Sequence, residues 1–196
     1  MNELGVAIGN EAIYTRDDVS EVGLTGMDLV RLGLERGATA AAAQQTIIDL
    51  IEQYGQGGDC VYLAPRRYHN SFIIADGREA YVLETSERNW VSKRIGRSTA
   101  IANLVTIEDD WDTCSATLES YARSKHWWWG PPGRKLNFRS AFEDSPVREK
   151  SEPRFQASCQ YLASPGSCSV ESTLVQDLTQ RARGLIEFLD ERVLAV

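Results

Sequence analysis

The stretch Ser-Phe-Ile-Ile-Ala-Asp-Gly-Arg-Glu-Ala-Tyr-Val-Leu-Glu, residues 71–84, decides the fold. Its side chains follow a period of two on both sides of Asp76-Gly77, and an Asp-Gly pair between two such runs is typical of a β-hairpin. Residues 90–95 and 98–102 continue the pattern and predict two more strands, separated by Gly96. The centre of the chain is therefore expected to be an antiparallel sheet.

Two helices are expected before this hairpin. Residues 25–36 form the first, and Thr39 is placed to cap a second that ends at Tyr54. Its expected buried face consists of Ala40, Ala43, Ile47, Ile51 and Tyr54. Helices, then a meander, then further helices indicate an α+β layered domain.

The remaining chain is predicted in three parts, within a single domain over residues 1–196. Residues 109–125 are expected to be a helix, and residues 130–153, rich in proline and charge, an exposed loop. Residues 154–162 are a candidate helix, and Ser169 is a candidate N-cap for a helix that ends near Leu194.

Composition excludes several classes of function. A net charge of −7 argues against nucleic acid or an anionic membrane as the main partner. No apolar run approaches the roughly 18 residues of a membrane helix, and no secretory leader is visible. The four cysteines are widely spaced and fit a reducing, cytoplasmic setting; they are Cys60, Cys114, Cys159 and Cys168.

Neither a cofactor nor a metal ion is expected. His69 and His126 are the only histidines and lie far apart in the sequence, and no phosphate-binding loop is present. A nucleophilic pair of Cys60 or Cys114 with either histidine is formally possible, but nothing in the flanking residues indicates an activated thiol.

Two asparagines follow predicted strands. Asn10 comes after residues 6–9 and Asn103 after residues 99–102. A side-chain amide at such a place can donate to a developing oxyanion, although asparagine is also common there as ordinary turn chemistry. The aromatic run Trp127–Trp129 is a second candidate, either as a ligand or partner surface or as an anchor for the core.

Five ordered motifs, at residues 2–12, 24–36, 54–58, 69–72 and 81–85, resemble the secernins. Secernins belong with the cysteine dipeptidases of the N-terminal nucleophile hydrolase superfamily. The resemblance implies an αββα fold with two antiparallel sheets between helix layers. It also implies hydrolysis of small peptides or acyl amides by an N-terminal cysteine whose α-amino group is the general base. Asn103 then matches the amide donor of the oxyanion hole, and Asn10 more loosely matches a second donor or a substrate contact.

The sequence departs from this family at the nucleophile. Removal of Met1 would expose Asn2, which has neither thiol nor hydroxyl, and none of the four cysteines stands at the family position. We therefore expect an internal part of the fold, truncated at both ends and inactive alone. A gene-model fragment without an independent role is one alternative. A non-catalytic binding or assembly module is another, with a homo-oligomer as the candidate assembly.

Overall fold

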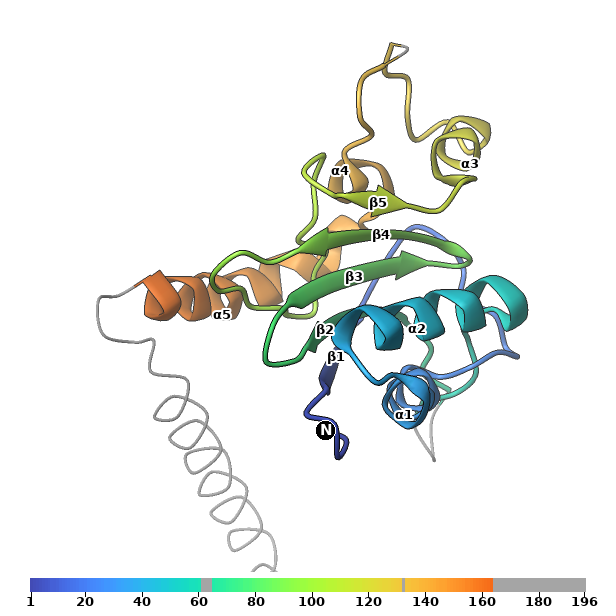
Figure 1. Cartoon of the computed structure of the whole chain (residues 1–196). Coiled ribbons are helices and arrows are strands. Elements are labelled where there is room, and N and C mark those ends of the chain that lie inside the picture. The colour runs from blue at the N-terminus through green and yellow to red at the C-terminus, as the bar shows by residue number, and fades with distance from the viewer. Residues whose placement is uncertain (61–64, 132, 164–196) are drawn as a thin grey trace, which may run out of the picture. The chain divides into compact units, whose positions relative to one another are not determined.

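The computed structural model describes residues 1–60, 65–131 and 133–163 (Figure 1). The chain divides into two compact units, Met1–Gln156 and Ala157–Val196, and the first contains the sheet and every candidate site residue. That both units form one domain over residues 1–196 stays a prediction. Cys168 and the helix expected from Ser169 to about Leu194 lie outside the described residues.

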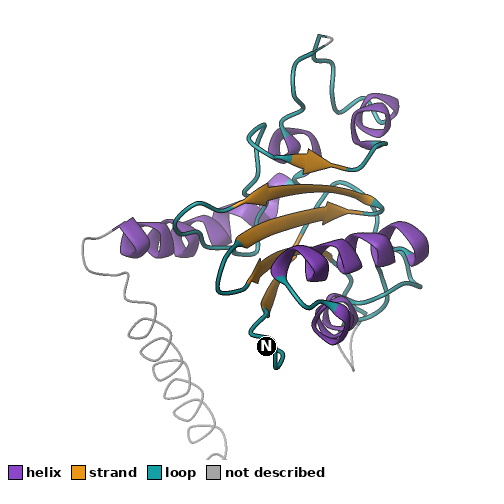
Figure 2. Ribbon diagram, in the orientation of Figure 1, coloured by secondary structure: helices purple, strands orange, loops and turns teal. Residues whose placement is uncertain are grey.

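The first unit is built on one antiparallel sheet of five strands in the order β1-β2-β3-β4-β5 (Figure 2). The strands are β1 Ala7–Ile13, β2 His69–Ala75, β3 Ala80–Ser86, β4 Asn89–Arg94 and β5 Thr113–Cys114. Ile74 lies opposite Tyr81, which confirms the predicted hairpin. The α+β class is confirmed as well. Of the two sheets that the resemblance implied, one lies within the described residues.

Helices α1, Gly26–Arg36, and α2, Ala40–Tyr54, connect β1 to β2 and confirm the predicted helical pair. Thr25 and Asp28 form a reciprocal capping box at the start of α1, which satisfies backbone N–H groups that a helix end leaves open. Four of the five residues expected on the buried face of α2 are buried. Tyr54 is the exception at 57% exposure, because the chain turns away immediately after it at Gly55.

The two faces of the sheet bury separate apolar clusters. On one face, α1 and α2 pack against the strands through a cluster that includes Leu29, Ile47, Phe72, Ile74 and Leu83. On the other face lie the 104–107 segment, α3 (Leu118–Ser124) and α4 (Phe138–Phe142), with a cluster that includes Val82, Val91, Val105, Leu118 and Phe138. Side chains that alternate along one strand therefore reach two different environments.

Two element predictions between the meander and the later helices were wrong. Residues 98–101 form no strand, and Ala102 makes only an isolated bridge to Leu104. The segment that follows binds buried carboxylates instead of a strand, as described below. The helix expected over residues 109–125 is limited to α3, because Thr113–Cys114 pairs with β4 as β5.

The prediction of an exposed loop over residues 130–153 was also wrong. This region contains α4 and most of α5, Ser145–Ala163. Leu136, Phe138 and Phe142 are completely buried, and the two phenylalanine rings stack with centroids 4.7 Å apart. The apolar residues between the prolines therefore decide the local structure, and Pro146 stands in the first turn of α5, where its missing N–H is tolerated. No helix among the described residues is long and apolar enough to cross a membrane.

Candidate functional site

Asn103 lies in the turn between Ala102 and Leu104 and joins three parts of the first unit. Its Nδ2 donates to the main-chain carbonyl of Ala12 at 3.0 Å and to Oε2 of Glu11 at 3.0 Å. Its Oδ1 accepts from Arg154 Nη2 at 3.0 Å. The amide is thus fixed against β1, the strand at the edge of the described sheet, and both of its N–H groups have acceptors.

The segment after Asn103 is fixed by two buried carboxylates. The backbone N–H of Val105 donates to Glu143 at 3.0 Å. The N–H groups of Thr106 and Ile107 donate to Glu84 at 2.8 and 3.0 Å, and the Thr106 hydroxyl adds a bond of 2.7 Å. The backbone N–H groups of residues 105–107 therefore donate to side-chain carboxylate oxygens, where the residues of a strand would donate to backbone carbonyls of a neighbouring strand.

Glu84 is completely buried on β3. Burial raises the pKa of its carboxyl above the ordinary value, while hydrogen bonds from Thr106, Ile107 and Ser71 oppose the rise. This residue was not singled out from the sequence, since a glutamate in a period-two run resembles a solvated position.

Asn10 lies in the middle of β1, so its predicted position after a strand was wrong. The strand continues to Ile13 because all seven residues of β1 pair with β2. Asn10 Nδ2 donates to Asn70 Oδ1 at 3.2 Å, beside Gly26 at the start of α1. A Cβ on Gly26 would lie 2.0 Å from Asn70 Oδ1, so only glycine allows this approach.

The two predicted asparagines lie on opposite faces of β1. Asn10 contacts α1, on the face that packs against the helical pair. Asn103 binds Glu11, whose side chain alternates to the other face. No hydrogen bond joins the two amides within the described part of the chain, and a single oxyanion hole made by both is not formed in this arrangement.

A buried hydrogen-bond network of polar side chains lies beyond the end of β1. The sequence analysis did not predict this network. Thr15 Oγ1 lies 2.9 Å from His69 Nδ1 and 2.7 Å from Ser86 Oγ, and Ser86 donates to Asp17 Oδ2 at 2.7 Å. Tyr121 donates to the other Asp17 oxygen at 2.6 Å. Asp17 also forms an ion pair with Lys125 at 3.5 Å.

The number of protons on these side chains decides which group donates in each of their hydrogen bonds. Ser86 has one hydroxyl proton, which goes to Asp17, so the Thr15 proton goes to Ser86. His69 Nδ1 must then donate to Thr15. The other ring nitrogen, Nε2, is buried without a hydrogen-bond partner in the described structure, 3.7 Å from a Glu87 carboxylate oxygen. His69 consequently cannot act through Nδ1 as a base for the Thr15 hydroxyl.

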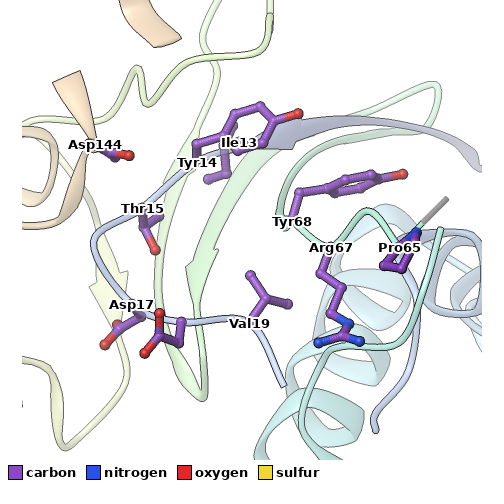
Figure 3. Close-up of a pocket in the computed structure, with 10 residues that line it drawn as sticks. Ile13, Tyr14, Thr15, Asp17, Val19, Pro65, Arg67, Tyr68 and Asp144 are labelled. Carbon is purple, nitrogen blue, oxygen red and sulfur yellow. The ribbon is translucent and has the colours of Figure 1, made fainter. Parts of the chain in front are cut away.

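A pocket of about 540 Å³ opens beside this hydrogen-bond network (Figure 3). Thr15 and Asp17 line it together with Tyr14, Arg67 and Tyr68. Burial, followed by a hydrogen bond with Cys60, raises the pKa of Tyr68 to about 12. The Tyr68 hydroxyl is therefore a neutral hydrogen-bonding group at neutral pH.

Cys60 and Cys114, the two cysteines considered as nucleophiles, show no activating contact among the described residues. Burial, with a smaller contribution from Glu119, raises the pKa of Cys114, which disfavours its thiolate. Cys60 Sγ contacts the Gly58 carbonyl at 3.7 Å, and within the described part of the chain neither thiol forms a hydrogen bond with Asn103 or with a histidine. Among the described residues, no group of three His, Cys, Asp or Glu side chains is placed to hold a metal ion.

The sequence matches the model of a peptidase family over residues 1–171. The chain belongs to this family, peptidase family C69. Its function is therefore that of a peptidase in general terms, with peptides as the implied class of substrate.

Proposed function

We propose that the chain is part of a secernin-like, cysteine-type dipeptidase or amidohydrolase that acts on small C–N amide bonds. The observation that carries this proposal is the family match, which extends over residues 1–171 and includes β1, the whole sheet and Asn103. The Asn103 amide is held against the edge strand β1 by its bond to the Ala12 carbonyl, and this supports a role for Asn103 in the reaction.

Asn103 is proposed to donate a hydrogen bond to the oxyanion that forms when a nucleophile attacks the amide carbonyl. Because both Asn103 N–H groups are engaged, the oxyanion must replace one acceptor. Glu11 is the acceptor that can leave, since its side chain is only partly buried and can move into solvent, whereas the Ala12 carbonyl belongs to the strand. The Ala12 bond then keeps the amide oriented. Loss of such a donor costs roughly 2.7–4 kcal/mol of transition-state stabilisation.

Asn10 is proposed as a second substrate contact, held in its rotamer by Asn70. The nucleophile of the proposed mechanism is an N-terminal cysteine, whose α-amino group has an ordinary pKa suited to a general base. No hydrogen bond joins Cys60 or Cys114 to Asn103 among the described residues. We expect the 196-residue chain alone to be inactive.

The experiment compares the purified 196-residue protein with the longest product of its reading frame. Release of free amine from dipeptides and N-acyl amides is followed for both. We expect turnover only from a product that carries an N-terminal cysteine, with kcat/KM reduced about 100-fold or more by Asn103→Ala. Turnover by the 196-residue chain that survives replacement of all its cysteines would contradict the proposal.

One observation favours the alternative, a non-catalytic binding or assembly module. Trp129 is 70% exposed and stacks on His126 with ring centroids 5.3 Å apart, whereas Trp127 and Trp128 pack against the core. An assembly role predicts a homo-oligomer by light scattering that becomes a monomer in Trp129→Ser. A monomer at all concentrations, before and after the substitution, would remove this alternative.

A further inference from the structure

Strand β1 forms one edge of the described sheet, with β2 on its other side (Figure 1). Along an antiparallel strand, consecutive residues direct their N–H and C=O groups alternately toward one neighbour and toward the other. The Asn70 N–H donates to Thr85 on β3, so the even-numbered residues of β2 face β3 and the odd-numbered ones face β1. Gly9 lies opposite Ile73 and therefore bonds toward β2. The even-numbered residues of β1 consequently direct their backbone groups outward, away from the sheet.

The outward edge of β1 is covered at its two ends. Before the strand, the Val6 carbonyl accepts from the Asn2 N–H at 2.9 Å. Near the end of the strand, the Ala12 carbonyl accepts from the Asn103 amide at 3.0 Å. Both acceptors belong to even-numbered residues, in agreement with the alternation. The open part of the edge is therefore limited to residues 7–11.

Four backbone groups of this open stretch have no hydrogen-bond partner among the described residues. They are the N–H and C=O groups of Ile8 and of Asn10. The stretch has no lysine and no proline, and β1 pairs with β2 residue for residue, without a bulge. The side chains of Ala7 and the backbone of Gly9 are exposed, and Glu11 is already bound to Asn103. The features that usually prevent an edge from pairing with another strand are thus missing here.

We propose that this edge pairs with the same edge of a second copy of the chain, in an antiparallel two-fold dimer centred on Gly9. The open stretch is its own partner in this register, because residue 7 lies opposite residue 11 of the second copy. The Ile8 N–H donates to the Asn10 carbonyl of the second copy, and the Asn10 N–H donates to its Ile8 carbonyl. Two-fold symmetry repeats both bonds, so the four open groups of each copy all gain a partner.

The side chains of the stretch favour a second copy as the occupant. Gly9 lies on the two-fold axis, where opposed residues that do not bond to each other approach to about 4.5 Å between Cα atoms. Ala7 lies opposite Glu11 of the second copy, so no two carboxylates face each other. A register centred one residue later would place Ile8 opposite Ala12, whose carbonyl already has a partner. The register centred on Gly9 therefore uses only groups that are open in the single chain.

The dimer is tested with the purified 196-residue protein by sedimentation velocity over a wide range of protein concentration. Amide hydrogen exchange, followed by NMR at low and high concentration, identifies the residues that pair. The Ile8 and Asn10 amides should exchange at least about tenfold more slowly in the dimer. The Gly9 amide is the internal control, because it faces β2 and should exchange slowly at both concentrations. A monomer at every concentration, or a dimer with fast exchange at Ile8 and Asn10, would overturn the proposal.

Two substitutions at the exposed Ala7 test the register. Ala7→Glu places a carboxylate opposite Glu11 of the second copy and should weaken the dimer, whereas Ala7→Lys places an ammonium group there and should strengthen it. The two dissociation constants should differ roughly tenfold, because each contact occurs twice. Ala41→Glu and Ala41→Lys are the matched controls, since Ala41 is exposed on α2 and the same charges are added away from the edge. Equal dissociation constants for the two Ala7 variants would overturn the register.

The proposed dimer is separate from the aromatic surface at Trp129 and from the peptidase reaction. Trp129→Ser should leave the dissociation constant unchanged, and loss of the dimer in this variant would overturn pairing through β1. Every measurement reports association and none requires turnover. An inactive chain that dimerises with slow exchange at Ile8 and Asn10 therefore supports the interface, whatever the outcome of the hydrolysis assay.

Discussion

The Asn103 side-chain amide donates to the main-chain carbonyl of Ala12 at 3.0 Å. This bond connects the edge strand of the sheet to a turn 91 residues later in the chain. It places a polar side chain, and not another strand, against that part of β1.

Asn103→Ala should lower the free energy of unfolding by about 1–3 kcal/mol, because the Ala12 carbonyl and Arg154 each lose a partner. Urea denaturation measures the loss. Glu11→Gln is the control, since a glutamine can still accept from Asn103, and it should change the stability by less than about 1 kcal/mol. Equal stability of Asn103→Ala and the natural chain would show that the amide is not held as described.

Gly26→Ala should destabilise the chain by roughly 1–3 kcal/mol, because the added Cβ would lie 2.6 Å from Asn10 Nδ2 and closer still to Asn70 Oδ1. Gly77→Ala is the matched control, as nothing lies within 4 Å of a Cβ at that position. Thermal unfolding of both variants gives the comparison. A Tm of Gly26→Ala equal to that of Gly77→Ala would mean that the two asparagines are not packed against α1.

Glu84 should give the chain a specific dependence of stability on pH. Its pKa is raised in the folded state by burial, so folding takes up a proton between the ordinary glutamic acid pKa and the raised value. The stability contribution of this group is therefore complete below the ordinary pKa and is lost as the pH rises through the raised pKa. Glu84→Gln removes this dependence.

The measurement is the difference in unfolding free energy between the natural chain and Glu84→Gln from pH 4 to pH 8. This difference should fall as the pH rises from the ordinary glutamic acid pKa to the raised pKa of Glu84. The difference cancels the titration of the other carboxyls, such as Asp76, whose pKa is lowered by backbone hydrogen bonds. A difference that rises with pH would show that the hydrogen bonds from Thr106 and Ile107 outweigh the burial of Glu84.

His69 should carry a proton on Nδ1 at neutral pH, because the Thr15 and Ser86 hydroxyl protons are both directed toward Asp17. Two-bond ¹H–¹⁵N NMR spectra of the imidazole rings distinguish the two nitrogens directly. Ser86→Ala is the informative variant, since it frees the Thr15 proton to reverse its direction toward His69. A His69 ring protonated only on Nε2 in the natural chain would contradict the proton order described here.

Local sequence signals predicted the elements of the fold that depend on neighbouring residues. Asp76-Gly77 between two period-two runs gave the β2–β3 hairpin, and Thr39 marked the start of α2. The helix α4 was missed because its burial comes from Phe138 and Phe142 packing on distant residues, while nearby prolines and charges suggested solvent exposure. Proline and charge describe local preference only, and long-range packing overrode it.

The candidate site could be predicted only in part for the same reason. Asn103 was found through a motif, but its partners Glu11 and Arg154 are 92 and 51 residues away, and no periodic pattern connects them. Thr15 and Ser86, 71 residues apart, have hydroxyl side chains that are common in loops and strand ends. Their chemistry arises only after the sheet brings them together.

The side-chain carboxylates that hold residues 105–107 have a consequence for the order of events in folding. Glu84 can accept from Thr106 only when β3 is in place. Glu143 lies 38 residues after Val105, so it can accept from Val105 only when the segment around α4 has folded back against residues 104–107. Contacts between residues so far apart form after the local hairpins and helices, because closing long loops costs entropy first. The turn that carries Asn103 is therefore expected to become ordered late, on a sheet that is already complete.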